Sequence, residues 1–533
     1  MQKTPAKNNQ PATAITLNRR AFVKTAALAG AGLAAGSAIA RAAKGQGRQK
    51  AGANAAPSSA PSGNPQPAAP AQDSSTALSA APAGAPNILM IAIDDLRPWV
   101  NSFGFPQAKT PNLDRLAAMG MSLTRAYCPA PVCNPSRTAL LTGLRPSTTG
   151  VYENIDDWRV NKVASKVPTL PAWLKQHGYA AYAAGKIYHD TYRQESDWTQ
   201  YAPKEHQQAM ASPTTNLGVG GIRFRPVSAR DSEMYDYQTV DWCIDKLQRK
   251  YDKPLLLGCG LHKPHMPWEA PQKYFDMYPL DKIELPKVQA NLDDLPPAGV
   301  KLALRSGDHA AILKSGRWKE AVQAYLACIT FMDVQIGRLL DALEKSAYKD
   351  NTLILFWVDH GWHHGEKHHW RKFALWEEAT RIPVIWAVPG VMKPGSRCAR
   401  TLDHMGIYPT LCELAGVPLP PHLEGVSYRA LLENPDAAWD RPAICTYMQN
   451  NHTVRTEKWR YIRYHDGGEE LYDHDADPLE WKNLAKDPQY APVKKDLAKW
   501  FPTVNLPEQN PNRGGGGKKG GKGNKGGDGG DDE

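Results

Sequence analysis

Three runs of consecutive apolar residues dominate the hydrophobic pattern of this chain. They lie at 87–93, 255–260 and 352–358, and acidic or basic residues follow closely after each one. Unbroken apolar runs of this length are typical of strands that are buried on both faces of a parallel sheet. Shorter apolar stretches predict further strands at 121–127, 179–184 and 383–388.

Helical periodicity and capping residues predict helices between these strands. The segment 110–120 has Thr110 as its N-cap, Pro111 at the first helical position and Gly120 as its terminating residue. Strands that alternate with helices indicate an α/β fold with a mostly parallel sheet. Further helices are predicted at 169–177, 232–250 and 318–347.

The C-terminal part follows a different pattern, with short alternating stretches at 445–447, 459–463 and 470–473 that predict antiparallel strands. A closing helix is predicted at 477–484. The predicted organisation begins with a signal peptide at 1–42 and a disordered Ala/Pro/Gly linker at 43–85. A catalytic domain at 86–436 follows, and then a small C-terminal α+β subdomain with an antiparallel sheet at 437–505. The chain ends in a disordered Gly/Lys-rich tail at 506–533.

The net charge of +10 lies mostly outside the predicted domains. Residues 1–85 carry +8 and residues 511–533 carry +1, which leaves +1 for the body of the chain. A nearly neutral body gives no reason to expect a nucleic acid partner. The eight cysteines are scattered and include no Cys-x-x-Cys pair, so we expect neither a small-domain disulfide framework nor structural zinc.

The most distinctive motif is Cys-Asn-Pro-Ser-Arg at 133–137, which opens a short helix that we expect to be amphipathic. Unpaired N–H groups and the helix dipole favour negative charge at such a position. An unmodified Cys133 is therefore expected to be a thiolate with a low pKa. The alternative is a buried structural cysteine, which we expect for most of the other seven.

Charged and histidine residues follow the predicted buried strands. Because the ends of strands in one open α/β sheet converge, we expect these side chains to lie close together. Adjacent carboxylates are costly to bury unless a cation neutralises them, and oxygen donors suit Ca²⁺. The residues are Asp94 and Asp95, Lys186 and His189, His265, and Asp359 with His360.

The N-terminus resembles a bacterial twin-arginine export signal. Arg19 and Arg20 precede Phe22, Lys24 and an Ala/Gly-rich apolar run at 26–40 that is too short and too weakly apolar to span a bilayer. This resemblance implies export in the folded state to the periplasm or the extracellular space, without a stable membrane anchor. A chance pair of arginines before an Ala-rich helix is the alternative.

The motif at 133–137 closely resembles the formylglycine signature of the type I sulfatases, and the resemblance covers about 86 to 490. It is closest to the iduronate-2-sulfatase branch, through the stretches at 94–98, 158–160, 262–265 and 359–362. It implies an alkaline-phosphatase-like three-layer sandwich around a large mixed, mostly parallel sheet. It also implies one Ca²⁺ per chain, oxidation of Cys133 to formylglycine by the formylglycine-generating enzyme, and a sulfated oligo- or polysaccharide substrate.

The resemblance further implies that the hydrated aldehyde at position 133 attacks sulfur. Arg137 and Lys186 would contact the hydrate, and Lys372 would hold the sulfate oxygens. His265 would protonate the leaving sugar oxygen, and His189 would take the proton of the second hydroxyl as sulfate leaves. The implied metal ligands are Asp94, Asp95, Cys133, Asp359 and His360.

Several alternatives remain open at this point. Nitrogen at His360 suits Zn²⁺ or Mn²⁺ in general, but the iduronate branch also has His here, so we expect Ca²⁺. The histidine-rich run 360–369, in which Lys367 stands where that branch carries His, serves either substrate and loop contacts or a second metal. Trp362 either stacks on a sugar or packs in the core, and His262 is either functional or a structural neighbour of His265.

The main alternative function is a phosphonate monoester or phosphodiester hydrolase of the same superfamily. A non-catalytic sugar-binding protein that kept the fold is the third hypothesis. The loops at 194–230 and 266–315, which show little periodicity, are expected to shape the substrate site.

Overall fold

The computed structural model describes residues 80–203 and 218–509, and the predicted signal peptide lies outside these ranges. An eight-stranded sheet with the order β12-β2-β11-β8-β1-β6-β3-β4 forms the centre of the fold. All neighbouring strands pair in parallel except β11, which is antiparallel to β2 and β8. The strands are β1 (Asn87–Ile93), β2 (Met121–Tyr127), β3 (Ala180–Gly185), β4 (Gln200–Tyr201), β6 (Leu255–Leu261), β8 (Thr352–Val358), β11 (Arg381–Ala387) and β12 (Ser396–Asp403).

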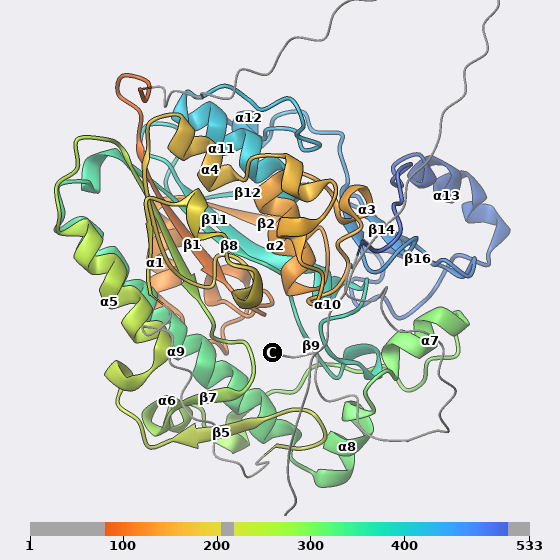
Figure 1. Ribbon diagram of the computed structural model, residues 1–533. Coiled ribbons are helices and arrows are strands. Elements are labelled where there is room, and N and C mark those ends of the chain that lie inside the picture. Colours follow the sequence, from red (N-terminus) through yellow and green to blue (C-terminus); the bar gives the residue numbers. More distant parts are fainter. Residues whose placement is uncertain (1–79, 204–217, 510–533) are drawn as a thin grey trace, which may run out of the picture. The chain divides into compact units, whose positions relative to one another are not determined.

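Helices cover both faces of this sheet and make three layers, as predicted (Figure 1). One group comprises α1 (Pro111–Met119), α5 (Tyr235–Leu247) and α9 (Trp318–Glu344). The other group comprises α2 (Cys133–Thr142), α4 (Leu170–Gln176) and α11 (Ile407–Ala415), with α3 (Pro146–Thr149) and α12 (Arg429–Glu433) beside them. No helix among the described residues has both the length and the apolar character needed to cross a membrane.

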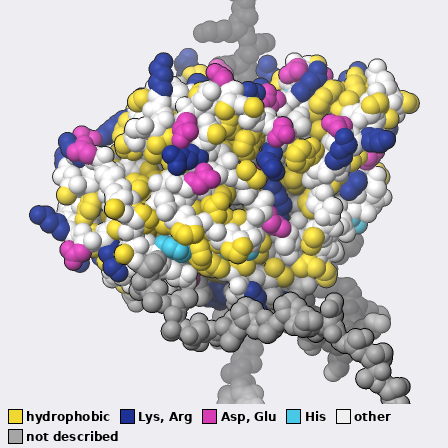
Figure 2. Space-filling model, turned by 90° about the horizontal axis from the view of Figure 1, so that it is seen from above, with side chains coloured by type: hydrophobic (Ala, Val, Ile, Leu, Met, Phe, Trp, Pro, Cys, Tyr) yellow, Lys and Arg dark blue, Asp and Glu magenta, His cyan; other side chains and the backbone are white. Residues whose placement is uncertain are grey.

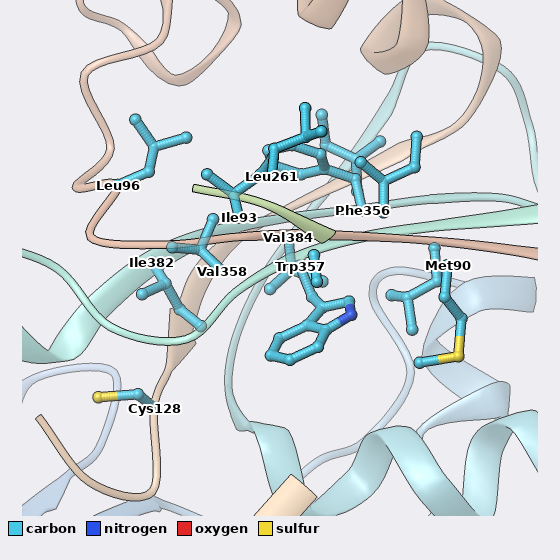
Figure 3. Close-up of a cluster of buried hydrophobic side chains, with 14 of the residues drawn as sticks. Met90, Ile93, Leu96, Cys128, Leu261, Phe356, Trp357, Val358, Ile382 and Val384 are labelled. Atoms are coloured by element: carbon cyan, nitrogen blue, oxygen red, sulfur yellow. The ribbon is translucent and has the colours of Figure 1, made fainter. Parts of the chain in front are cut away.

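The hydrophobic core is continuous through the central sheet. Every residue of β1, β6 and β8 is buried, which confirms the prediction from the three apolar runs. The successive residues Phe356 and Trp357 of β8 project to opposite faces of the sheet, so one strand contributes to both layers of packing (Figure 3). These strands have no exposed face, and their ends are therefore held rigidly.

The two regions with little periodicity contain short elements. Strand β5 (Phe224–Val227) pairs in parallel with β7 (Trp268–Pro271), and this ribbon packs on α9. After β7 come α6 (Gln272–Asp276), α7 (Pro297–Ala303) and α8 (Asp308–Ser315). These segments wrap around the end of the sheet at which β6 and β8 terminate (Figure 1).

A second, four-stranded antiparallel sheet follows in the chain: β13 (Ala443–Thr446), β14 (His452–Arg455), β15 (Trp459–Arg463) and β16 (Glu469–Asp473). It has a small core of its own, which includes Leu471 and Leu497. The predicted closing helix at 477–484 is wrong, because this segment forms turns and the helix α13 lies at Ala491–Ala498. Glu480 has a φ of 56°, which no right-handed helix permits, and it reaches Arg460 in an ion pair instead.

The surface carries charges of both signs. On the face shown in Figure 2, Lys and Arg side chains alternate with Asp and Glu among scattered hydrophobic groups, without a large region of one sign. This distribution is consistent with the nearly neutral charge expected for the body of the chain.

Candidate active site

The predicted functional side chains meet where four neighbouring strands end. β8, β1, β6 and β3 lie side by side and run parallel, so their carboxyl ends share one edge of the sheet. Asp94 and Asp95 follow β1, Asp359 and His360 follow β8, and Lys186 follows β3. The strand order therefore brings together residues that are far apart in the sequence.

Cys133 is the first residue of α2, as predicted, and lies at this edge. Its Sγ is 3.3 Å from His360 Nε2 and 3.0 Å from Lys372 Nζ. All ten residues of α2 are buried, because α3, α4 and α11 pack around it, so the prediction of an amphipathic helix is wrong.

The encoded thiol is not the reactive thiolate that its position suggested. Burial, followed by the Asp94 carboxylate, raises the pKa of Cys133, and the opposing effects of Lys372 and Lys186 are smaller. The helix N-terminus does not compensate for a site lined with carboxylates. As encoded, the side chain is therefore an unreactive thiol at neutral pH.

Four groups at the site offer a ligand atom each within 4.8 Å of one another: Asp94, Cys133, Asp359 and His360. Asp95 belongs to a second set with Cys133 and His265. The two sets adjoin, since Asp95 Oδ1 is 3.4 Å from His360 Nδ1. Asp95 Oδ2 is buried without a hydrogen-bond partner in the structure, which is the kind of acceptor that a cation would satisfy.

Three cations surround these carboxylates. Arg137 Nε donates to Asp359 Oδ2 at 2.9 Å, and its guanidinium also bonds to the backbone carbonyl of Lys186. Lys186 Nζ is 2.5 Å from Asp94 Oδ2, and Lys372 Nζ donates to Asp95 Oδ1 at 3.1 Å. Three carboxylates therefore face three cations, so a bound divalent ion would leave the pocket positive and suited to an anionic ester.

The carboxylates resist full ionisation without further positive charge. Burial raises the pKa of Asp359 to about 7 and raises the pKa of Asp95 well above its usual range. Burial acts on Asp94 in the same direction, but Lys186, His265 and Arg137 hold the pKa of that carboxyl well below its usual range. Three buried acids with divergent pKa values and mostly oxygen donors fit a hard divalent cation.

Two histidines lie at the rim of this cluster. His265 Nδ1 is 2.6 Å from the carbonyl oxygen of Met266, which directs Nε2 toward Asp95 Oδ2 at 3.7 Å. His189 follows β3, and its Nδ1 has no hydrogen-bond partner among the described groups. Burial lowers the pKa of both rings, that of His189 to about 3. His262 pairs with Asp190 at 2.7 Å and is thus a neighbour that fixes the loop.

A strained loop delivers Lys372. It includes the antiparallel pair β9 (His363–His364) and β10 (Trp370–Arg371), and four of its non-glycine residues have left-handed φ angles. Such conformations persist only where the surroundings impose them, and they are frequent at functional sites. The residues are Lys367 (56°), His368 (53°), Arg371 (82°) and Phe373 (67°).

The sequence reasoning missed the residues that hold the Asp94-Asp95 turn. Asp95 has a φ of 59°, and its carbonyl accepts a hydrogen bond of 2.7 Å from the Tyr325 hydroxyl. The same hydroxyl accepts from the backbone N–H of Arg97, whose guanidinium pairs with Glu366 at 2.8 Å. The position of Arg97, two residues after the paired acids, is only a weak sequence signal of its role. No signal in the sequence marks Tyr325, because it fits the apolar pattern of α9.

The histidine-rich run beyond His360 makes packing contacts. His364 stacks on Trp99 at 4.5 Å between ring centres, and within the described part of the chain His360 is the one residue of this run that belongs to a group of three or more potential ligands. Lys367 Nζ donates to the Tyr472 hydroxyl of β16 at 3.0 Å. Trp362 is fully buried and packs edge-on against Trp268, so it cannot stack on a sugar.

Comparisons with known proteins bear on the family and the fold of this chain. Residues 86–417 match the family described as Sulfatase, and residues 365–505 match the C-terminal family of N-sulphoglucosamine sulphohydrolase. The phosphonate monoester hydrolase of Agrobacterium radiobacter has the same fold, with a TM-score of 0.66 at 22% identity over 78% of this chain and 94% of that one.

Two relatives are similar over most of their length. A "Sulfatase" of Formosa agariphila is 38% identical over 443 residues, covering 79% of this chain and 87% of that protein. The "Iduronate 2-sulfatase" of Homo sapiens is 27% identical over 507 residues, covering 76% and 92%. Since the family match spans more than half of the sequence, this chain belongs to the sulfatase family and is a sulfuric ester hydrolase.

Proposed function

We propose that this enzyme removes sulfate from a sulfated saccharide, with a 2-O-sulfated uronate-type unit as its substrate. The observation that carries the proposal is the convergence of Lys372 and the cluster of carboxylates on Cys133. The similarity to human iduronate 2-sulfatase supports the substrate class. Turnover of 2-O-sulfated uronate oligosaccharides, compared with saccharides sulfated at other positions, tests it; hydrolysis of only the latter contradicts it.

We propose that Cys133 acts after oxidation to formylglycine, because burial keeps the encoded thiol protonated and therefore weakly nucleophilic. The hydrated aldehyde would supply one hydroxyl to attack sulfur and a second whose deprotonation releases sulfate. Peptide mass analysis around position 133 should show the aldehyde, and Cys133→Ala should abolish turnover. A fully active enzyme with an unmodified thiol contradicts the proposal.

The remaining roles are those that the resemblance implies, and the positions of the side chains support them. Lys372 and Lys186 would hold the sulfate oxygens and the nucleophile by charge. His265 would protonate the leaving oxygen through Nε2, since its Nδ1 is engaged by Met266. Its lowered pKa would rise when an anionic ester binds beside it. His189 would accept the proton that is released with sulfate.

We propose one Ca²⁺ per chain, held by Asp94, Asp95, Asp359, His360 and the modified residue 133. The predominance of buried carboxylate oxygens supports this choice. Bound to these ligands, the ion would offset the charge of the sulfate ester and activate the hydrate. Elemental analysis of the purified enzyme tests the identity of the ion; stoichiometric zinc without calcium contradicts it.

A phosphonate monoester or phosphodiester hydrolase is the second candidate. The shared fold supports it, and a phosphonate monoester resembles a sulfate ester in its tetrahedral centre and single negative charge. A comparison of kcat/KM for paired aryl sulfate and aryl phosphonate esters separates the two. A higher value for the phosphonate would overturn the proposed substrate class.

We also propose export by the twin-arginine machinery, after the formylglycine-generating enzyme has acted in the cytoplasm. The sequence around Arg19 and Arg20 supports this, although it lies outside the described residues. Replacing both arginines with lysine should retain the protein in the cytoplasm. Unchanged export of that variant, measured by cell fractionation, would contradict the proposal.

A further inference from the structure

A small crevice of about 50 Å³ lies beside the candidate active site. Val132 and Phe373 form part of its wall, and they directly neighbour Cys133 and Lys372 in the chain. The volume is enough for a substituent of the size of a carboxylate but too small for a sugar ring. The crevice can therefore take a substituent of a saccharide whose sulfate is bound at Cys133.

Hydrogen bonds hold the walls of this crevice in place against the nucleophile. The backbone N–H of Asn134 donates to Asn154 Oδ1 at 3.0 Å, and the Asn134 side chain donates to the carbonyl of Glu153 at the same distance. The N–H of Phe373, another lining residue, donates to the carbonyl of Pro131 at 3.1 Å. Groups that line the crevice therefore keep a defined position relative to Cys133.

Arg305, which follows α7, brings a positive charge to this crevice. It donates to the hydroxyl of Tyr447, and its guanidinium carbon lies 4.7 Å from the ring centre of Phe373. Both aromatic residues are buried, whereas Arg305 is exposed. These contacts orient a planar guanidinium at the mouth of the crevice, and such a group fits a carboxylate with two parallel hydrogen bonds.

The other lining groups favour a saccharide. Glu153 and Asn154 offer acceptors and a donor for sugar hydroxyls, and Phe373 offers an apolar surface. Among the residues that line the crevice, Arg305 is the cation and Glu153 the anion, so Arg305 is the group that would attract a carboxylate. We propose that this crevice is a saccharide subsite in which Arg305 binds a sugar carboxylate; this rests on the proposed function.

Competition against hydrolysis of an aryl sulfate tests the subsite without requiring turnover of a saccharide. A 2-O-sulfated uronate disaccharide and its carboxyl-reduced form would each compete with the aryl sulfate, and their inhibition constants would be compared. The measurements would be made on the wild-type enzyme, Arg305→Ala and Lys301→Ala. Lys301 is the matched control, because it is an exposed cation on α7 that does not line the crevice. A second pair of competitors consists of a disaccharide with a sulfated neutral sugar beside an unsulfated uronate, and its carboxyl-reduced form. This pair shows whether the carboxylate that binds comes from the sulfated sugar or from its neighbour.

We expect wild type and Lys301→Ala to bind the carboxylated form about tenfold more tightly than the reduced form. Arg305→Ala should abolish this difference. Arg305→Lys should retain part of this difference, and the control Lys301→Ala should change the aryl sulfate kcat/KM by less than about twofold. Equal binding of both forms to wild type in both pairs overturns the subsite, as does a preference that survives in Arg305→Ala. Failure of the proposed function appears separately, as absent turnover of the sulfated saccharide.

Discussion

Replacing Arg460 with Met should strongly destabilise the protein, because this residue neutralises two buried acids. Its side chain is fully buried in β15, with Nη2 2.5 Å from Glu377 Oε2 and Nε paired with Glu480. It also donates to the backbone carbonyl of Leu375 at 2.8 Å, three residues after Lys372. The C-terminal sheet thereby supports the loop that carries the lysine.

The magnitude follows from the Glu480 carboxyl. Burial favours its neutral form, yet Arg460 and His474 hold its pKa at about 2, compared with an ordinary value of 4.5. This depressed pKa stabilises the fold by about 3 kcal/mol above pH 4.5, and the contribution is lost as the pH falls toward 2. Removing one partner of a buried ion pair costs about 3–5 kcal/mol, in agreement with this value.

Urea unfolding followed by tryptophan fluorescence would measure this cost at neutral pH and at about pH 4. We expect Arg460→Met to lower the free energy of unfolding by about 3–5 kcal/mol at neutral pH, and by less in acid, where Glu480 becomes protonated in the variant. Arg400→Met is the control, because Arg400 forms a partly exposed pair with Glu457 that solvent screens, so its replacement should lower the free energy of unfolding far less. A cost for Arg460→Met that is equally small, or that does not shrink in acid, would refute the reasoning.

Two further predictions concern the site itself. Gly260→Ala should lower kcat at least about tenfold, because the added Cβ would lie 2.3 Å from the backbone carbonyl carbon of Lys186. Gly258→Ala on the same strand is the control and should retain activity, since its new Cβ meets only side-chain atoms at 3.0 Å or more; equal kinetics of the two variants would contradict the prediction. Treatment with a chelator should abolish turnover and lower the melting temperature by about 4 °C or more, since the buried carboxylates would lose their cation, and added calcium should restore both. Differential scanning fluorimetry measures the melting temperature, and an unchanged value after chelation would argue against a metal at this position.

The parts of the fold that could be predicted from the sequence depend on local pattern. The runs that became β1, β6 and β8 were predicted almost to the residue, because a strand buried on both faces requires continuous apolar side chains. The helix at 477–484 failed because Glu480 forms an ion pair with Arg460 in the neighbouring sheet and adopts a left-handed backbone to reach it. A propensity within the segment contains no information about that partner.

The candidate site shows the same division. Cys133 at a helix start could be predicted from a motif, but its raised pKa could not, because that depends on burial and on Asp94, which belongs to another strand. Arg305 lies in a loop without periodicity, and only the structure shows that it lines the crevice beside Cys133.

The sequence by itself determined which segments are buried strands, that Cys133 opens a helix and which residues follow each strand, because short-range periodicity and capping encode these features. Tertiary structure alone decided that β8, β1, β6 and β3 are neighbours. The sequence predicted only that the ends of the strands converge, and the strand order sets how Asp94, Lys186 and Asp359 lie around Cys133. It also decided that a strained loop, supported by a second sheet, places Lys372 against the sulfur. Strand order and loop conformation are set by packing between distant segments, which a local pattern does not specify.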